Sequence, residues 1–521
     1  MAGARGVIRN LTQQGAVSAD ADVLVIGAGT VGLVIAAELA KAGLKVICLE
    51  SGAEHQDADE HPLNEVVQTR SVYSGAAHGR FRCLGGSSTR WGGALIPFLE
   101  GDLKRRAWPI EHSEILSHLP AVERLFGLQA GSYETADVLG ATASDYVARL
   151  AKWPPFAKRN VANLFAAEIA SEAGPSIWLN ATATDFEVEN GRLISVTGRA
   201  SCGSSITVRA QEIVLAAGAI ETTRLLLLMD RQNGGAACAP DDQIGRYFHD
   251  HLSVAIGELK DADLRSLNRL IGFRFEAGGT MRNLRFELAN ESPFRETVPP
   301  HFVHIGFDKE TTGGFDALRD AFRAVQRRRL PNINTLLRLV RGAPWLFKAV
   351  WWRFIEKRLL FPEGARLHVH MVIEQAPRPD NRISLSATRT DVFGQPLAEI
   401  DWSISEIDIA ALRRAGDAFQ KSWDQSPLSR LARFVRRPDE DAERDLSKGG
   451  GIYHPTGSTR MGDEPAKAVV DRNLNLFRIP NITVLSTSVL PNGGGANPTL
   501  MLLLLAQRSV QRLKKVFKVT E

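Results

Sequence analysis

Three glycines between a predicted strand and a predicted helix place the strongest constraint on the fold of this chain. The segment 22–26 is short, apolar and β-branched, which is typical of a buried strand, and the Ala- and Leu-rich segment 33–42 predicts a helix. A second strand is expected at 44–49, and it ends at an acidic residue, Glu50. The glycines between the first strand and the helix have the spacing Gly-x-Gly-x-x-Gly: Gly27, Gly29 and Gly32. This order of elements predicts a Rossmann-type α/β unit.

Each part of this unit has a physical role in binding a dinucleotide. Gly27 permits a tight turn, Gly29 lets the backbone approach a pyrophosphate, and Gly32 allows the helix to pack closely on the strand. The N-terminus of the helix directs its partial positive charge at the phosphates, and the Glu50 carboxylate can accept hydrogen bonds from ribose hydroxyls. A chance glycine-rich turn is the alternative. The unit does not distinguish NAD from FAD, since both contain ADP.

Length, charge and cysteine content limit the remaining possibilities. The 521 residues are enough for two domains, and a net charge of +4 does not favour a nucleic-acid partner. The four cysteines are Cys48, Cys83, Cys202 and Cys238. They are far apart and form no CxxC pair, which is typical of reduced thiols in a cytoplasmic protein. Residues 1–20 contain no apolar run of the signal-peptide kind. No uncharged apolar segment reaches about 18 residues, so a spanning helix is not expected.

The basic residues are concentrated in the segment 317–362. This segment contains eleven Lys or Arg and two Asp or Glu, a net charge of +9, which leaves −5 for the rest of the chain. It includes the run 327–329 of three arginines and the aromatic residues Trp345, Trp351 and Trp352. A basic helix with aromatic anchors can lie on a membrane surface. The alternative is a helical insertion whose arginines are solvated or pair with acids elsewhere.

Four stretches of the chain resemble the glucose–methanol–choline (GMC) oxidoreductases, a family of flavin-dependent alcohol oxidases and dehydrogenases. The first is Leu-Gly-Gly-Ser-Ser-Thr-Arg-Trp-Gly-Gly at residues 84–93. In the family this loop passes over the flavin, and its glycines let the chain lie close to a flat ring. The resemblance therefore implies FAD, with contacts from the following residues: Gly85, Gly86, Ser87, Ser88, Trp91, Gly92 and Gly93.

Two further stretches, and a short strand that precedes the first of them, resemble structural parts of the family. Residues 216–226 are similar to a strand-to-helix turn beside the cofactor, which implies contacts from Ala217 and Gly218, and residues 180–183 resemble the strand whose backbone receives the adenine at Ala183. Residues 244–251 resemble a Gly-Arg-x-x-x-Asp-His signal. The His-Asp-His run at 249–251 could suggest a metal, but structural hydrogen bonding at a domain hinge is favoured, and no metal is expected.

The fourth stretch carries the catalytic residues that the resemblance implies. Residues 453–462 read Tyr-His-Pro-Thr-Gly-Ser-Thr-Arg-Met-Gly, and Ala-Asn-Pro-Thr follows at 496–499. In the family these loops bring a His and a second His or Asn together over flavin N5. The resemblance thus implies His454 and Asn497 as the catalytic pair. It also implies cofactor contacts from the same region of the chain: Val489, Asn497, Pro498 and Thr499.

Alcohol oxidation requires that the hydroxyl proton leaves and that a hydride passes from carbon to flavin N5. A neutral imidazole is a suitable proton acceptor near pH 7, since its ordinary pKa is about 6.5. His454 is therefore expected to be the base, and Asn497 is expected to orient the substrate oxygen. A second pair, His368 and His370, lies two residues apart on a predicted strand, so both side chains are expected on one face, either lining a substrate pocket or in a core or surface position.

Three positions distinguish this chain within the family. Some members attach FAD covalently through a His in the first loop; Arg90 stands there, so non-covalent FAD is expected. Trp91 resembles the sugar-oxidising members, and Ser486 stands where many members have Asp. The expected substrate is a sugar, glycoside or related alcohol, with oxygen, a quinone or another redox partner as electron acceptor. The alternatives are an FAD-containing lyase of the same family and a non-enzymatic flavin-binding protein.

The expected architecture is α/β (α+β overall). A Rossmann-like FAD-binding domain is built from the discontinuous segments 20–107, 175–260 and 448–521. An antiparallel-sheet substrate domain with helices takes 108–174 and 261–447, and the basic helical insertion lies near 317–362. A cytoplasmic protein with a possible peripheral membrane contact is expected.

Overall fold

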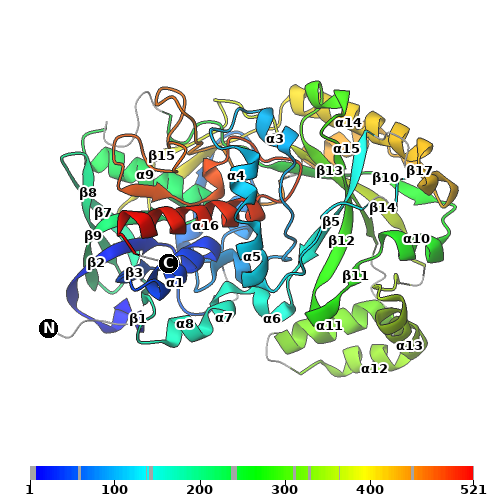
Figure 1. Ribbon diagram of the computed structural model, residues 1–521, viewed down its shortest axis with the longest axis horizontal. Coiled ribbons are helices and arrows are strands. Elements are labelled where there is room, and N and C mark those ends of the chain that lie inside the picture. Colours follow the sequence, from blue (N-terminus) through cyan, green and yellow to red (C-terminus); the bar gives the residue numbers. More distant parts are fainter. Residues whose placement is uncertain are drawn as a thin grey trace.

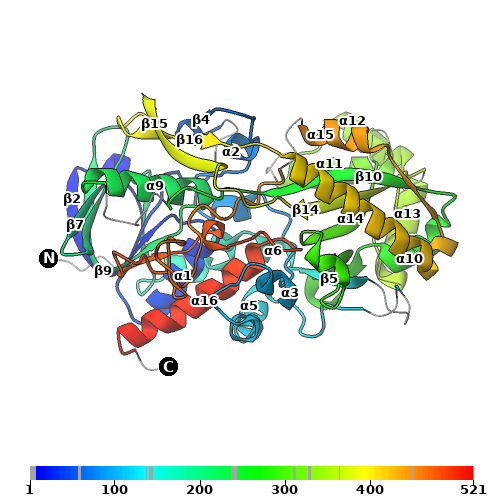
Figure 2. The ribbon, with the colours of Figure 1, turned by 90° about the horizontal axis from the view of Figure 1, so that it is seen from above.

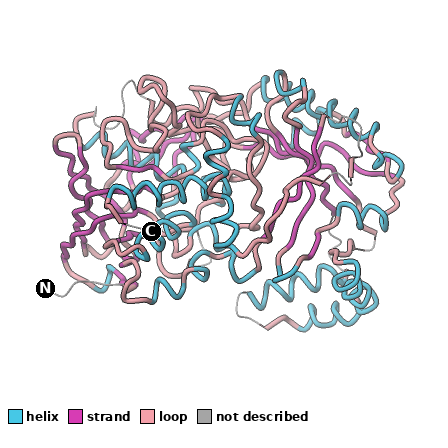
Figure 3. Tube along the Cα trace, viewed as in Figure 1, coloured by secondary structure: helices cyan, strands magenta, loops and turns pink. Residues whose placement is uncertain are grey.

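The computed structural model describes residues 7–56, 60–135, 138–139, 145–235, 243–308, 313–326, 330–362, 364–447 and 451–519. The arginine run at 327–329 and Cys238 lie outside the described residues. The molecule is elongated, with one group of strands at each end of its long axis (Figure 1, Figure 3). Two large sheets therefore organise the fold.

The first large sheet is mainly parallel and holds the Rossmann unit. Its order is β1-β6-β3-β2-β9-β8-β7, and β18 pairs with β9. The strands are β1 (Ile8–Asn10), β2 (Ala16–Ile26), β3 (Val46–Leu49), β6 (Ser176–Leu179), β7 (Thr182–Glu189), β8 (Arg192–Arg199), β9 (Ser205–Leu215) and β18 (Ile482–Val484). Among the described strands of this sheet, only the pairs β7–β8 and β8–β9 are antiparallel. Strand β18 comes from near the C-terminus, so both ends of the chain build this sheet.

The glycine unit folds as the sequence predicts. Strands β2 and β3 pair in parallel, and α1 (Thr30–Lys41) connects them. Helix α1 packs beside α16 (Thr499–Val516) in the left half of Figure 1. Parallel strands are usually covered by helices on their faces, which accounts for the apolar character of both helices. The expected fold class is confirmed.

The second large sheet is antiparallel, in the order β11-β12-β13-β14-β10-β17, and β5 pairs with β12. Its strands are β5 (Tyr146–Trp153), β10 (His251–Lys260), β11 (Arg274–Phe275), β12 (Met281–Leu288), β13 (His301–Phe307), β14 (Leu367–Glu374) and β17 (Arg433–Arg436). We call it the substrate sheet. On β12 the apolar side chains Leu284 and Phe286 belong to the core that α14 (Glu406–Gln425) helps to form. Because side chains alternate along a strand, Arg285 and Glu287 face the opposite side.

A small third sheet joins distant parts of the chain, with β4 (Val66–Gln68) parallel to β16 (Pro396–Asp401) and β15 (Arg382–Thr390) antiparallel to it. It lies along the upper edge of Figure 2.

Strand β10 belongs to the substrate sheet, although the sequence analysis placed it in the FAD-binding segment 175–260. The chain therefore passes from the first large sheet to the substrate sheet near residue 251, earlier than expected, because β10 hydrogen-bonds to β14 and β17.

The remaining helices connect and cover these strands, and one of the expected helices is broken in two. The remaining helices are α2 (Gly75–His78), α3 (Glu100–Lys104), α4 (His112–Leu116), α5 (Leu119–Phe126), α6 (Phe156–Arg159), α7 (Val161–Leu164), α8 (Ala166–Ala170), α9 (Ala219–Gln232), α10 (Leu264–Ile271), α11 (Gly314–Gln326), α12 (Ile333–Arg341), α13 (Ala343–Trp351) and α15 (Asp439–Ser447). Pro109 predicts the start of one helix within residues 108–127, but two helices, α4 and α5, are present there. Pro120 explains the break, since its ring would clash with the carbonyl four residues earlier, at Leu116. Among the described residues, no helix is long and apolar enough to cross a membrane.

Candidate active site

A cleft of about 1200 Å³, including solvent at its mouth, runs along the Rossmann unit. It is lined by the turn between β2 and α1, the segments 79–82, 86–87 and 216–221, and residues from the last third of the chain. Many of the residues expected to contact the cofactor line it: Gly27, Gly29, Glu50, Gly86, Ser87, Ala217, Gly218, Pro498 and Thr499. The catalytic candidate His454 lines the same cleft. Segments far apart in sequence thus meet around one space.

The glycines of the cleft leave room for a ligand. A Cβ atom at Gly29 or at Gly218 would meet no protein atom within 4 Å. By contrast, a Cβ at Gly32 would lie 1.9 Å from the carbonyl oxygen of Gly27, and one at Gly86 would lie 2.8 Å from the Cα of Gly29. Gly32 and Gly86 are therefore required by close backbone packing. The open space at Gly29 and Gly218 fits a cofactor that lies against the backbone.

Glu50 closes one end of the glycine turn. Its carboxylate accepts backbone N–H bonds from Ala28 (2.8 Å) and Gly52 (2.9 Å), one on each oxygen. Burial raises the pKa of Glu50, although these hydrogen bonds oppose the shift. The Ser51 hydroxyl also donates to Oε1, at 3.4 Å, so the second acceptor position of Oε2 is the one left for a ligand. The side chain can therefore bind hydroxyl groups in the cleft while it holds the turn.

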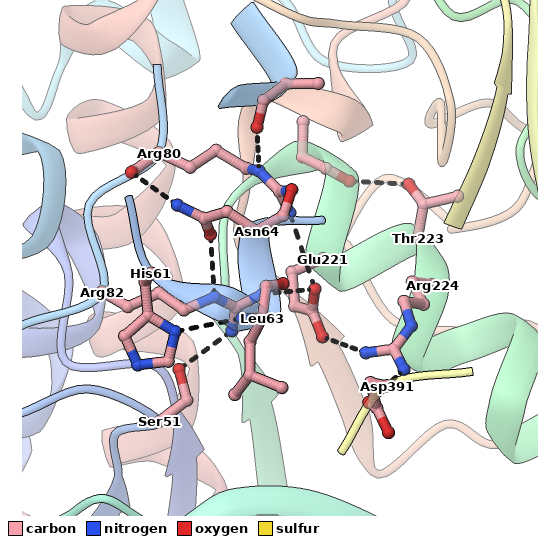
Figure 4. Close-up of polar contacts among 12 residues, drawn as sticks. Ser51, His61, Leu63, Asn64, Arg80, Arg82, Glu221, Thr223, Arg224 and Asp391 are labelled. Atoms are coloured by element: carbon pink, nitrogen blue, oxygen red, sulfur yellow. Dashed lines mark hydrogen bonds and ion pairs between the residues drawn. The ribbon is translucent and has the colours of Figure 1, made fainter. Parts of the chain in front are cut away.

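A buried ion cluster that the sequence analysis missed borders the cleft (Figure 4). Glu221 pairs with Arg82 at 2.7 Å, with Arg224 at 2.9 Å and with Arg80 at 3.7 Å, and Arg224 also pairs with Asp391 at 2.6 Å. Burial alone would raise the pKa of Glu221, but the three guanidinium groups lower it to about 2. Three cations and two anions leave one positive charge beside the cleft. The cluster thus fits a ligand that carries phosphates.

The proposed catalytic side chains are in contact. Nδ2 of Asn497 lies 3.2 Å from Nε2 of His454, and Nδ1 of His454 lies 3.4 Å from Nδ1 of His251. Nε2 of His251 lies 2.7 Å from the carbonyl oxygen of Gly494. At the other end, Nη1 of Arg285 donates to Oδ1 of Asn497 at 2.7 Å. A continuous chain of hydrogen bonds therefore runs from Arg285 to Gly494.

The groups at the two ends of this series of hydrogen bonds determine which atoms within it donate. A carbonyl only accepts, so His251 donates through Nε2 and, as a neutral ring, accepts at Nδ1. His454 must then donate from Nδ1. Since Oδ1 of Asn497 accepts from Arg285, its amide group faces His454, and Nε2 of His454 is the accepting atom. The imidazole lone pair of His454 that can accept a proton is therefore on Nε2, next to Asn497.

The charge state of His454 agrees with this arrangement. Burial lowers the pKa of His454 well below its ordinary value, and the neighbouring His251 and Arg285 lower it further. Burial likewise lowers the pKa of His251 to about 4. Both rings are therefore neutral at pH 7, as the hydrogen-bond chain requires.

Asp250 holds the loop that carries His454. Its carboxylate accepts hydrogen bonds from the backbone N–H of His454 (2.8 Å), Tyr453 (3.0 Å) and His251 (2.6 Å), and from the Tyr73 hydroxyl (2.7 Å). Tyr453 has a φ of 68°, a conformation that is costly for a side chain and is offset by these bonds. Asp250 therefore connects the segment 453–454 to the start of β10 through structural hydrogen bonds. No group of three metal-ligating side chains occurs in the described parts of the chain.

The substrate sheet presents a polar row near this pair. Arg285 on β12 lies directly across from Arg149 on β5, and His304 on β13 lies directly across from His370 on β14. Arg149 also pairs with the buried Glu287. The rings of His304 and His370 stack at 5.3 Å. Arg285 comes from a segment without a recognisable motif, so no sequence signal pointed to it.

The remaining predicted residues are not among those that line the cleft: Gly32, Gly85, Ser88, Trp91, Gly92, Gly93, Ala183, Val489 and Asn497. Ser88 is buried, and its hydroxyl donates to the Gly85 carbonyl at 2.6 Å. The indole N–H of Trp91 donates to the Arg159 carbonyl at 2.7 Å, and its ring packs against the hydrophobic core around the first large sheet. Ala183 and Val489 are buried. These side chains support the loops and strands around the cleft.

Comparison with known proteins agrees with the geometry. Residues 377–506 match the family described as GMC oxidoreductase, and residues 20–72 match the FAD binding domain. The chain is 22% identical to 2-methyl-1,2-propanediol dehydrogenase of Mycolicibacterium austroafricanum, over 95% of each chain. It is 24% identical to 6'''-hydroxyparomomycin C oxidase of Streptomyces lividus, over 94% of this chain and 90% of that one.

A solved structure shares the fold over nearly the whole chain. Pyridoxine 4-oxidase from Mesorbium loti superimposes with a TM-score of 0.58 and 18% identity, over 94% of this chain and 99% of that one. The matched GMC segment contains both His454 and Asn497, and the matched FAD-binding segment contains the glycine turn and Glu50. The chain therefore resembles the GMC family of FAD-dependent oxidoreductases in both its FAD-binding segment and its GMC segment.

Proposed function

We propose that this protein oxidises a CH–OH group of a sugar, glycoside or related alcohol, with His454 as the base. The contact between Nε2 of His454 and Nδ2 of Asn497, beside a cleft that fits FAD, is the observation that supports it. An FAD-dependent alcohol oxidoreductase agrees with the family. The substrate class and the roles of the two residues are the parts that require a test.

The residues of the cleft suit FAD. Glu50 would bind the ribose hydroxyls, the N-terminus of α1 at Gly29 and the cluster around Arg82 would face the phosphates, and the open backbone at Gly218 would lie against the cofactor. Bound FAD supplies the hydride acceptor for alcohol oxidation. Arg90 is exposed and cannot form the covalent link that some members make, so the FAD is proposed to be non-covalent. If acid precipitation left the yellow chromophore in the protein pellet, the attachment would be covalent.

The hydrogen-bond chain suits His454 to general-base catalysis. A substrate hydroxyl placed between His454 and Asn497 can donate its proton to Nε2 while it accepts a hydrogen bond from the Asn497 amide. The Nδ1 proton stays on His454 during this transfer, hydrogen-bonded to Nδ1 of His251. Arg285, which donates to the Asn497 oxygen, adds positive charge next to the oxygen that loses its proton.

The names of the relatives are consistent with hydroxyl-rich substrates. They include a propanediol dehydrogenase, a hydroxyparomomycin oxidase and a gluconate 2-dehydrogenase. Both oxidases and dehydrogenases occur among them, so the names leave oxygen, a quinone and another redox partner open as the acceptor. Stopped-flow reoxidation of the reduced enzyme with oxygen or with a quinone identifies the acceptor.

Anaerobic flavin reduction tests the proposal directly. We mix the purified holoenzyme with sugars, glycosides and polyols without oxygen and follow bleaching of the flavin band. The variant His454→Ala should retain FAD, but the substrate should reduce this FAD roughly 100- to 10,000-fold more slowly than in the wild type. His118→Ala is the control, since His118 is buried outside the cleft. Fast bleaching in His454→Ala would refute the base assignment.

The same experiment separates the alternatives. A wild-type protein that consumes substrate without any bleaching would be a lyase that retains FAD. A protein that binds FAD but neither bleaches nor converts any substrate of the panel would favour the non-enzymatic alternative.

A further inference from the structure

The exposed large apolar side chains of this protein are concentrated in one segment. They follow α11, on the helices at the lower right of Figure 1. We call this set the insertion surface: Leu330, Ile333, Leu336, Leu337, Val340, Phe347, Val350, Trp351, Phe354 and Ile355. A contiguous apolar area of this kind on a protein surface marks an interaction site.

On α12 the apolar side chains form one stripe that faces solvent. Ile333, Leu336, Leu337 and Val340 have the spacing i, i+3, i+4, i+7, which puts them on one face of a helix. Val340 is 73% exposed, whereas Thr335, on the other side of the helix, is 5% exposed. Helix α12 packs on α11. The helix therefore turns its apolar stripe away from the protein.

Helix α13 repeats this arrangement. Phe347, Trp351 and Phe354 are separated by four and three residues, so they share one face of α13 and the π-helical turn that follows it, Trp352–Glu356. Phe347 is 78% exposed and Trp351 60% exposed. Trp345, on the opposite side, is buried against Phe315 of α11 at a ring distance of 5.8 Å. Two adjacent helices thus expose their apolar sides.

The charge of the same segment is positive. Residues 330–358 contain six Lys or Arg and one acid, a net charge of +5. Arg341, Lys348 and Lys357 are exposed. The acid, Glu356, forms an ion pair with Arg269. Apolar and aromatic side chains with a basic border are the pattern of an interfacial helix on an anionic bilayer.

We propose that the insertion surface docks the protein on an anionic lipid bilayer. The apolar side chains enter the boundary between headgroups and acyl chains, and the lysines and arginines bind the lipid phosphates. Charge complementarity selects the lipid over a second copy of this chain, since two copies would bring two basic surfaces together. This proposal does not depend on the substrate or on the role of His454.

Flotation with lipid vesicles tests the proposal. The holoenzyme is mixed with vesicles of phosphatidylcholine alone, or of an equimolar mixture of phosphatidylglycerol and phosphatidylcholine, at physiological salt. We expect the protein to float with the anionic vesicles and not with the neutral ones. The variant Phe347→Gln, Trp351→Gln, Phe354→Gln should reduce the floating fraction at least about tenfold.

A matched control separates the insertion surface from general hydrophobicity. The variant Phe156→Gln, Val392→Gln, Ile407→Gln removes three similarly exposed apolar side chains from elsewhere on the protein and should float like the wild type. Flavin absorbance and alcohol oxidation in solution should be unchanged in both variants, which shows that they are folded. Equal loss of flotation in both variants would contradict the assignment.

Two other outcomes would overturn the proposal. If the wild type does not float with anionic vesicles at physiological salt, the insertion surface does not dock on such a bilayer. If sedimentation velocity shows a wild-type dimer that the Phe347, Trp351 and Phe354 variant converts to a monomer, the insertion surface is an interface between copies of this chain.

Discussion

Nη1 of Arg285 donates a hydrogen bond of 2.7 Å to Oδ1 of Asn497. The two residues lie 212 positions apart in the chain. The bond fixes the orientation of an amide that could otherwise rotate by half a turn with little change in shape. It therefore decides that Asn497 presents a donor, not an acceptor, to His454.

Replacing Arg285 should impair catalysis more than FAD binding. Arg285→Gln removes the charge that holds the Asn497 amide, and hydrogen bonds to charged groups contribute about 1.5–3 kcal/mol. We expect kcat/KM to fall roughly 10- to 100-fold, while the flavin spectrum is retained. Arg285→Lys keeps a charged donor and should recover part of the loss, as measured by steady-state kinetics. A Gln variant as active as the wild type would show that the bond has no role in catalysis.

The pH profile should reflect the buried state of His454. Because burial, His251 and Arg285 lower its pKa, His454 stays neutral and able to accept a proton well below pH 6.5. The wild-type kcat/KM should therefore decline only at lower pH than an ordinary histidine would give. In Arg285→Gln the pKa of His454 should rise, so the decline should begin at higher pH. The residual activity of His454→Ala should lack this decline. A decline that persists in this variant would instead come from Asp250 or Glu374, whose pKa values burial raises to about 6 and about 7.

Two glycines of the same turn should respond differently to alanine. A Cβ at Gly29 meets no protein atom, so Gly29→Ala should fold normally and bind FAD more weakly. A Cβ at Gly32 would lie 1.9 Å from a backbone oxygen, so Gly32→Ala should lower the melting temperature. Thermal unfolding of the apoproteins and FAD titration measure the two effects. Unchanged FAD affinity in Gly29→Ala would contradict the placement of the cofactor.

Loss of the buried carboxylate at Glu221 should destabilise the fold. Glu221→Gln leaves Arg80, Arg82 and Arg224 close together with only Asp391 to offset them. Breaking a buried ion cluster in this way costs about 3–5 kcal/mol of unfolding free energy. Denaturant unfolding of the apoprotein measures it. Glu464→Gln, in an exposed pair with Lys467, is the comparison and should cost about 0–1 kcal/mol.

Local patterns were sufficient to predict the Rossmann unit and the residues that it contributes to the cleft. Gly27, Gly29 and Glu50 act through backbone geometry within a single β–α–β unit, so their spacing already contains the structural information. The roles of His454 and Asn497 came from motifs that resemble a family, and the structure brings the two side chains into contact. The tautomer of His454 could not be predicted, since it depends on His251 and on the Gly494 carbonyl.

The ion cluster and Arg285 could not be found in the sequence because their partners are distant. Glu221 lies 139 positions from Arg82, and neither stands in a pattern that names the other. Arg285 faces the active site because β12 alternates its side chains, and the sequence could not show which face is covered. The sheet assignment of β10 depends likewise on pairing with β14 and β17.

By itself, the sequence determined that the N-terminal part forms a dinucleotide-binding unit, because glycine spacing and hydrophobic runs act over short distances. That the C-terminal part joins this unit was implied by the resemblance of its motifs to a family. The sequence also showed a basic, aromatic-rich insertion. Only the tertiary structure decided that Val340, Phe347 and Trp351 face solvent and that Arg285 meets Asn497. Helical periodicity shows which side of a helix is apolar, whereas the packing of other elements decides what covers that side.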